Sequence, residues 1–397
     1  MIVRKALPAT LLVGALLVQS ALAADAPQIY RESSDALYNL DFSTAQHGFE
    51  DLTRQYPHNA DYWNALASTM WLKILYDQQK LDIDSYSGKS FGTRDSRDAV
   101  DPADEKKLRD TVATAMKNAD AVLDKSPKDV RALYALGVAN ATLASFESTA
   151  KRAYFTAYGD AKTARNLHQQ VLKLDPNFDD ARMTVGIFDY VVDVIPPWFR
   201  HSLGLLLGMH GDGKQAGIEK IQTASARGKQ VSIDARMVLI VIYNRERRYD
   251  DALQLLDELH SQYPRNFLFE MSRASIFGKM KQWDQAALTY ERIVQQIDSR
   301  TNGYERLRAA KVYSEMGRSQ VELHREDTAV GSFSKVVDDK DATPNEKGDA
   351  HLWMGKVFDM TKDRTSALQH YDAVLGLNCD SSLKKEAEAF KRRPFGP

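Results

Sequence analysis

The chain has 397 residues, and its 53 basic and 54 acidic side chains give a formal net charge of −1 at pH 7. A general nucleic-acid-binding protein needs a basic surface, so this balance argues against that class. Because Cys379 is the only cysteine, no internal disulfide can form. The chain lacks the period-two apolar runs that strands need, and we therefore expect helices to dominate.

The first 23 residues have the pattern of a cleaved secretory signal. Arg4 and Lys5 precede an apolar run from Ala6 to Val18, and Ala21-Leu22-Ala23 supplies small residues before a cleavage point. The apolar run is too short to span a bilayer, and no later run reaches the roughly 18 residues that a membrane helix needs. We expect export, with no transmembrane segment in the mature chain, and a periplasmic location if the source is a Gram-negative bacterium.

One pattern then recurs along the chain with a fixed phase. An alanine is followed four residues later by a bulky residue, and then by another apolar position three residues on. The pattern appears at Ala45, Phe49 and Leu52; Ala252, Leu256 and Leu259; Ala286, Tyr290 and Ile293; Ala329, Phe333 and Val336; and Ala367, Tyr371 and Val374. Repetition at about 34 residues predicts helical hairpins that bury their apolar faces only by stacking on one another.

The residues upstream of these alanines complete the resemblance. A large residue, a leucine and a small residue recur in the preceding helix, as in Trp63-Leu66-Ala67 and Leu133-Leu136-Gly137. This pattern resembles the tetratricopeptide-repeat (TPR) superfamily. The resemblance implies an all-α, TPR-type helical-hairpin solenoid, coiled as a right-handed superhelix with insertions. We expect it to form a single domain over residues 24–397.

Departures from the repeat length predict insertions. Residues 82–101 are rich in Ser, Asp and Gly, which favours an exposed loop. A lengthened hairpin is expected between Val130 and Leu174, and a third insertion over 191–213 contains two adjacent prolines and a Gly-Asp turn. A basic helix over 382–393 is expected to cap the array, because end repeats need a polar outer face.

The segment from Gly186 to Pro264 has a more specific resemblance. Its Pro196-Pro197 break, leucine-rich stretch and Gly211-Asp212 turn resemble the eukaryotic tetratricopeptide-repeat protein 39 family. The resemblance implies an adaptor without an assigned active site, although the export signal departs from that family. We favour packing of the insert in the superhelix core; contact with a membrane or a ligand is the alternative.

The segments that look like chemical sites have plainer explanations. Gly208–Gln215 nearly matches a phosphate-binding loop, but Gln215 stands where Ser or Thr would hold magnesium. We interpret it as a glycine-rich turn that opens a helix from Lys214 to Ala226. The histidines show no metal-ligand spacing on one helix, and there is no Cys–His cluster. We expect no catalytic residue, cofactor or metal site, and no enzyme activity.

The repeat phase also predicts where a partner would bind. In the repeats that this chain resembles, the second, fifth, ninth and twelfth positions of each first helix line the inner face. The predicted groove consists of Asn64, Trp71, Arg131, Tyr134, Met183, Ile187, Tyr190, Met237, Val241, Asn244 and Met271. Its middle is apolar and rich in methionine, which suits a peptide or a lipid-like ligand. An error of phase would instead place these side chains in the core.

The sequence therefore favours an exported, non-enzymatic scaffold or adaptor. It would bind protein or peptide segments, including those of an envelope complex, in an apolar inner groove. The alternative is a periplasmic carrier of a small molecule or lipid, in which the enlarged central units close into a cavity. An enzyme is a third hypothesis, and it needs an organised site that the sequence does not reveal.

Overall fold

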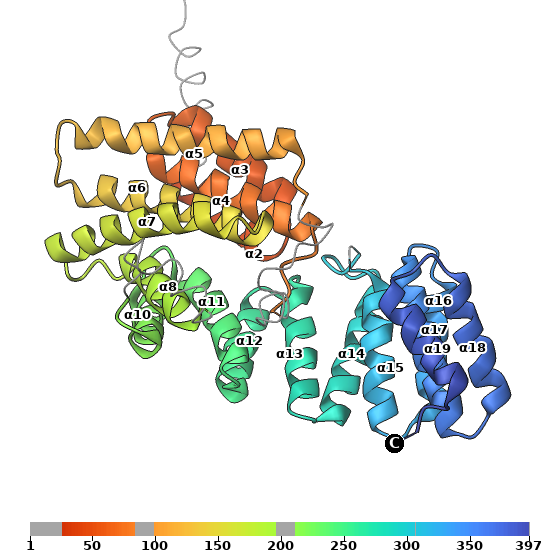
Figure 1. Ribbon diagram of the computed structural model, residues 1–397. Coiled ribbons are helices and arrows are strands. Elements are labelled where there is room, and N and C mark those ends of the chain that lie inside the picture. Colours follow the sequence, from red (N-terminus) through yellow and green to blue (C-terminus); the bar gives the residue numbers. More distant parts are fainter. Residues whose placement is uncertain (1–25, 84–98, 196–210, 306, 397) are drawn as a thin grey trace, which may run out of the picture. The chain divides into compact units, whose positions relative to one another are not determined.

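The computed structural model describes residues 26–83, 99–195, 211–305 and 307–396, and within these ranges the regular structure is helical, without strands (Figure 1). The fold class is all-α, as predicted. The chain divides into two compact units, each described by itself below. The first comprises Met1–Gln78 and Arg94–Phe188, and the second comprises Gln79–Thr93 and Asp189–Pro397.

The first unit is built from helical hairpins. Consecutive helices pack against each other as the pairs α2/α3, α4/α5 and α6/α7. A π-helical turn, η3, follows α6 and lengthens the third hairpin. The elements are α2 (Ala26–Tyr38), α3 (Phe42–Gln55), α4 (Ala60–Asp77), α5 (Pro102–Leu123), α6 (Val130–Ser145), η3 (Phe146–Ala150) and α7 (Tyr154–Leu174); α8 (Ala181–Val194) begins in this unit and ends in the second.

The second unit repeats the same plan. Its hairpins are α11/α12, α13/α14, α15/α16 and α17/α18, and α19 packs against the last of them. The elements are α10 (Lys214–Arg227), α11 (Ser232–Arg245), α12 (Tyr249–Gln262), α13 (Phe267–Lys279), α14 (Trp283–Asp298), α15 (Ala309–Glu322), α16 (Glu326–Asp338), α17 (Pro344–Met360), α18 (Arg364–Gly376) and α19 (Ser381–Arg392).

Side-chain caps fix where many of these helices begin. Asp41, Asn59 and Asp129 each accept a hydrogen bond from a backbone N–H in the first turn of the helix that follows. Such caps satisfy donors that the helix itself leaves unpaired. Before α17, Thr343 and Glu346 form a reciprocal capping box, which places the helix start at Pro344.

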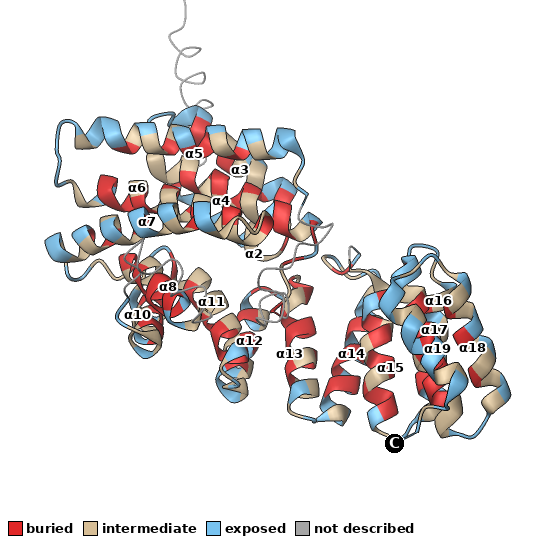
Figure 2. Ribbon diagram, in the orientation of Figure 1, coloured by how far each residue is buried: buried red, intermediate tan, exposed pale blue. Residues whose placement is uncertain are grey.

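The repeat positions predicted from the sequence form the core of the hairpins. Each of the five alanines is fully buried, and the bulky residue four positions later is at most 3% exposed. Figure 2 shows the buried residues as stripes on the faces that neighbouring helices share. This burial confirms the predicted TPR-type hairpin. The right-handed superhelical coiling and the single continuous domain stay predictions, as does the assignment of residues 1–23 as a signal.

A ring packed against a glycine closes three of the hairpins. Gly137, Gly317 and Gly355 lie on first helices, and the rings of His168, Phe333 and Tyr371 from the second helices lie directly against them. A Cβ added to Gly317 would stand 2.8 Å from the Phe333 ring, which is closer than such contacts ever come. These glycines therefore set the distance between the two helices of the hairpin.

The turn between first and second helix uses a left-handed residue that is not glycine. Leu40, Arg247, Lys281, His324 and Lys362 have φ angles between 54° and 65°, and each stands two residues before a second helix. A left-handed residue with a Cβ costs about 1 kcal/mol or more. The closure of the hairpin around its core supplies the compensating contacts.

Parts of the predicted insertions lie outside the described residues. These parts are 84–98 of the first insertion and 196–210 of the third, including the two prolines and Gly208–His210 of the near-phosphate loop. Gly211 and Asp212 lead into α10, which begins at Lys214 as expected for a glycine-rich turn that opens a helix.

A matched pair of glycine substitutions tests the close approach of the helices. Gly317→Ala should lower the free energy of unfolding by about 1–3 kcal/mol, because the Phe333 ring must move. Gly331→Ala, in the second helix of the same hairpin, meets nothing within 4 Å. It should leave stability unchanged or raise it by about 0.5–1 kcal/mol. Denaturant unfolding measures both, and equal midpoints for the two variants would contradict the argument.

Candidate binding surface

Some of the predicted groove residues of the first unit bond to neighbouring helices, and others keep exposed surface. Asn64 on α4 is buried, and its Nδ2 donates to the carbonyl of Ala135 on α6 at 2.8 Å. Trp71 is half-buried and donates from Nε1 to Thr149 Oγ1 in η3 at 2.9 Å. Arg131 is exposed, and Met183 and Ile187 on α8 are half-buried. The polar atoms of Asn64 and Trp71 thus hold the array together.

Tyr134 lies in the core, not in a groove. Its ring stacks on His168, with 4.9 Å between ring centroids and 16° between ring planes, and it also contacts Phe178 at 4.8 Å. It shares a buried cluster with Leu133, Val171 and Ala181. The flat imidazole of His168 and the start of the next helix enclose this side of α6. The predicted partner contact at Tyr134 is therefore corrected.

In the second unit, Tyr190, Asn244 and Met271 are buried, whereas Met237 and Val241 are half-buried. Asn244 on α11 accepts through Oδ1 from Lys279 Nζ on α13 at 2.8 Å. Met237 and Val241 share α11 with Asn244. The apolar part of the predicted groove that keeps some exposed surface in this unit is thus centred on α11.

Ion pairs and a hydrogen bond link α8, α10 and the residue that follows α11. Asp189 is fully buried and pairs with Lys220 at 2.6 Å; Lys220 also pairs with Asp212. The Tyr190 hydroxyl donates to Glu246 at 2.8 Å, and Lys214 Nζ lies 2.6 Å from the same carboxylate. Burial and the Glu246 carboxylate raise the pKa of Tyr190 well above its usual value. Lys214, the lysine of the near-phosphate loop, is thus engaged by Glu246.

The repeat phase continues beyond the predicted groove. We number each repeat so that the small residue of its first helix is position eight, and Gly317 and Gly355 then place Arg318 and Lys356 at position nine of the repeats that contain α15 and α17. Arg318 Nη2 lies 2.7 Å from Asp349 Oδ2 on α17, and Lys356 Nζ lies 3.3 Å from Glu386 Oε2 on α19. We call the cross-helix contacts of Asn244–Lys279, Arg318–Asp349 and Lys356–Glu386 the polar rungs. The same glycines could have located the latter two rungs in the sequence.

An aromatic group accompanies the last two rungs. Lys356 Nζ lies 4.6 Å from the ring centroid of Trp353, and the Arg318 guanidinium lies 5.5 Å from it. Trp353 in turn stacks on Phe333, with 6.2 Å between centroids. A cation over a ring face is attracted by the ring quadrupole. This end of the surface therefore combines charge with aromatic area.

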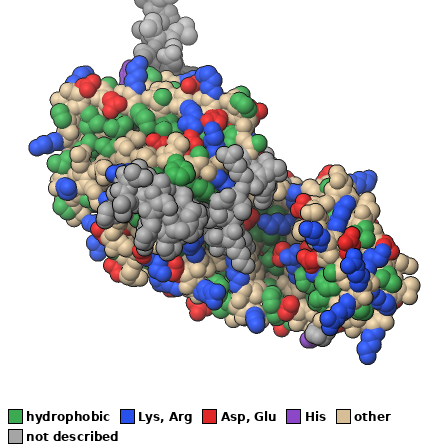
Figure 3. Space-filling view, in the orientation of Figure 1, with side chains coloured by type: hydrophobic (Ala, Val, Ile, Leu, Met, Phe, Trp, Pro, Cys, Tyr) green, Lys and Arg blue, Asp and Glu red, His purple; other side chains and the backbone are tan. Residues whose placement is uncertain are grey.

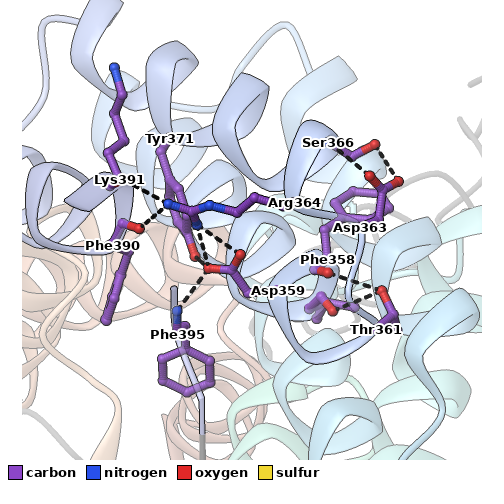
Figure 4. A network of polar contacts seen from close by, with 11 residues as sticks. Phe358, Asp359, Thr361, Asp363, Arg364, Ser366, Tyr371, Phe390, Lys391 and Phe395 are labelled. Atoms are coloured by element: carbon purple, nitrogen blue, oxygen red, sulfur yellow. Dashed lines mark hydrogen bonds and ion pairs between the residues drawn. The ribbon is translucent and has the colours of Figure 1, made fainter. Parts of the chain in front are cut away.

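The polar network at the end of α17 is drawn in Figure 4. The Asp359 carboxylate is 1% exposed and accepts from Arg364 Nη1 at 2.8 Å and from the Tyr371 hydroxyl at 2.9 Å. Arg364 Nη2 donates to the carbonyls of Phe390 and Lys391. Burial and the bond to Asp359 raise the pKa of Tyr371 well above its usual value. The network fixes α19 on the last hairpin.

In the part of the chain that the structure describes, the remaining titratable groups do not form a metal cluster. His351 and His370, on neighbouring helices, meet with 3.0 Å between their Nδ1 atoms, and burial lowers the pKa of both. One N–H···N hydrogen bond explains this approach. Over residues 26–83, 99–195, 211–305 and 307–396, no group of three or more His, Cys, Asp and Glu side chains is placed to hold a metal ion.

The comparisons with known proteins agree with the repeat pattern. A family model described as "Tetratricopeptide repeat" matches residues 30–73. Together with the hairpins, this match supports assignment to the TPR superfamily. No curated protein matches the sequence. Among the described helices, none is both long enough and apolar enough to cross a membrane.

Three of the similar solved structures are compared with this chain by identity, coverage and TM-score. Yeast Tom70 is 12% identical, with 96% of this chain and 91% of that chain covered and a TM-score of 0.37. The Cut9–Hcn1 hetero-tetramer of the APC/C is 14% identical, with 89% and 52% covered and a TM-score of 0.45. A tetratricopeptide-repeat protein from Parabacteroides merdae is 16% identical, with 83% and 98% covered and a TM-score of 0.30.

The buried His168 makes the stability of the first unit depend on pH. Burial lowers its pKa from about 6.5 to about 4, partly offset by the Nε2 contact with the Tyr134 carbonyl. The unfolded chain therefore binds the extra proton first, and stability falls as pH drops from 6.5 towards 4. The loss between pH 7.5 and 4.5 should be roughly 2–3 kcal/mol.

The variant His168→Phe isolates this contribution, because it keeps a ring against Gly137 and cannot titrate. Denaturant unfolding at the two pH values should show a smaller loss for the variant than for the unmodified chain. The same pH dependence in both chains would contradict the assignment to His168.

Proposed function

We propose that the protein is an exported, non-enzymatic scaffold that binds an extended protein segment along the first helices of the second unit. The main support for this proposal is that these first helices change from apolar at α11 to charged at α15 and α17. Half-buried Met237 and Val241 lie on α11, and the charged rungs of Arg318 and Lys356 lie on α15 and α17. A peptide offers both apolar side chains and backbone hydrogen-bonding groups, so it suits such a mixed strip.

The charged rungs favour a polypeptide over a lipid-like ligand. An acyl chain laid across Arg318, Asp349 and Glu386 would remove water from these partly exposed charges without replacing its hydrogen bonds. Figure 3 shows basic and acidic side chains interspersed over the α16–α19 part of the face in view. The carrier hypothesis would need a continuous apolar lining. An acidic or basic partner segment could instead exchange partners with the rungs.

The chemistry of the near-phosphate loop supports a non-enzymatic role. Its lysine, Lys214, pairs with Glu246, and the backbone N–H of Lys214 donates to Asp193 at 3.1 Å. A nucleotide phosphate would have to compete with both carboxylates. An adaptor role also agrees with the resemblance of residues 186–264 to the tetratricopeptide-repeat protein 39 family. That resemblance stays a prediction.

Site-specific photo-crosslinking tests the proposed surface. A photoreactive phenylalanine analogue at Val241 should give a discrete protein adduct in cells. The same analogue at Leu288, which is 51% exposed on a second helix, should not. Met237→Asp should weaken the adduct from Val241, because it places a charge on the apolar part of the strip. Equal adducts at both positions would contradict the proposal, and a lipid-sized adduct at Val241 would favour the carrier.

The export proposal has its own measurement. The intact mass of the protein isolated from the cell envelope should correspond to a chain that begins at Ala24. Ala23→Leu should block cleavage, because the signal-cleaving protease needs a small residue there. A soluble cytosolic protein that retains Met1 to Ala23 would contradict this proposal.

A further inference from the structure

The segment after α19 folds back onto the last hairpin. Pro394 disfavours helical geometry at the residue before it, and Arg393 is indeed extended, with φ −136° and ψ 119°. This geometry ends α19 and directs Arg393–Gly396 across α17. The backbone N–H of Phe395 then donates to Asp359 Oδ2 at 2.8 Å (Figure 4).

The Phe395 ring contacts the side chains of Phe390 and Lys356. It packs edge-to-face on Phe390, with 5.3 Å between centroids and 86° between planes. Lys356 Nζ lies 5.6 Å from the Phe395 centroid, 5.2 Å from Phe390 and 4.6 Å from Trp353. Three rings thus surround one ammonium group, and Phe395 is the ring that comes from the extended segment.

Asp359 is prepared for this contact by its own neighbours. Arg364 neutralises its charge, and Tyr371 orients it, so the carboxylate does not depend on Phe395 for its stability. Its bond to Phe395 instead recognises the backbone of an extended segment. Lys356 supplies side-chain selectivity, because a cation favours an aromatic ring over an aliphatic side chain.

This site lies on the proposed binding surface. With Gly355 at position eight of its repeat, Lys356 and Asp359 occupy positions nine and twelve of the same repeat. These are positions that the repeat phase assigns to the inner face. The Arg393–Gly396 segment therefore covers one end of the strip on which the proposed partner would lie.

We propose that this end of the surface is a peptide-binding site for an extended Pro-Phe segment, and that Arg393–Gly396 is its resident occupant in cis. The partner would be a protein segment that presents a phenylalanine after a proline and displaces the resident one. This inference rests on the proposed function. One backbone hydrogen bond and one ring hold the occupant, so a partner with further contacts along the strip can replace it.

Binding of a labelled peptide tests the proposal. The peptide has the sequence of Lys391–Pro397, is amidated and carries a fluorophore. It is titrated into the full chain, into full-length Phe395→Ala and into a chain that ends at Arg393. A segment tethered next to its site competes at an effective concentration in the millimolar range. Both variants should therefore bind the peptide at least about tenfold more tightly than the unmodified chain.

Two controls make the outcome specific. A peptide in which alanine replaces phenylalanine should bind at least about tenfold more weakly to either variant. Lys356→Met in the chain that ends at Arg393 should weaken binding of the original peptide while leaving the helical circular dichroism unchanged. Equal binding of the two peptides, or equal affinities of the opened and unmodified chains, would overturn the proposal.

The peptide-binding experiment and the crosslinking experiment at Val241 distinguish failure of this inference from failure of the proposed function. If the peptide fails to bind while the Val241 adduct forms as expected, the scaffold proposal stands and only the Pro-Phe site is lost. If the peptide binds but Val241 gives no protein adduct, the site acts without the rest of the strip.

Discussion

The close contact between a ring and a glycine determines how the two helices of a hairpin meet. At Gly137, Gly317 and Gly355 the absence of a Cβ lets the ring of the second helix rest on the backbone of the first. The rings of His168 and Tyr371 also carry polar atoms, which bond to the Tyr134 carbonyl and to Asp359. The contact between ring and glycine thus also positions the hydrogen-bonding atoms that these rings carry.

Those next contacts run between first helices. Asn64 bonds to α6, Asn244 bonds to α13, and the Arg318–Asp349 and Lys356–Glu386 pairs follow in the second unit. A hairpin cannot bury its apolar face alone, and these bonds fix how one hairpin stands on the next. The polar groups of this surface already have neighbours, so the partner that we propose would have to offer them equivalent bonds.

The end of the second unit shows how this packing positions an extended segment of the same chain. Tyr371 fills the space left by Gly355 and orients Asp359, and Asp359 receives the backbone of Phe395. Lys356, one residue after the same glycine, faces the Phe395 ring. The carboxylate of Asp359 thus contacts both Tyr371, which packs in the core, and the backbone of Phe395.

The repeat positions could be predicted from the sequence because burial at these positions follows helical periodicity. Ala252, Ala329 and Ala367 are buried wherever their hairpin packs, since the periodicity depends only on the helix itself. The periodicity predicts less well which way a side chain faces when it lies between the buried stripe and the exposed side of a helix. Whether Tyr134 faces solvent or core depends on His168 and on the next helix, and neither contact is encoded in the spacing of α6.

The sequence by itself determined the helical hairpins, the small residues between them and the absence of strand patterning, because each of these follows from local periodicity and side-chain size. Only the tertiary structure decided that His324 and Lys362 adopt left-handed turns, that Lys214 faces Glu246 and that Phe395 returns to Asp359. These features depend on groups from different helices meeting in space, and the free energy of such meetings is not a property of any one segment.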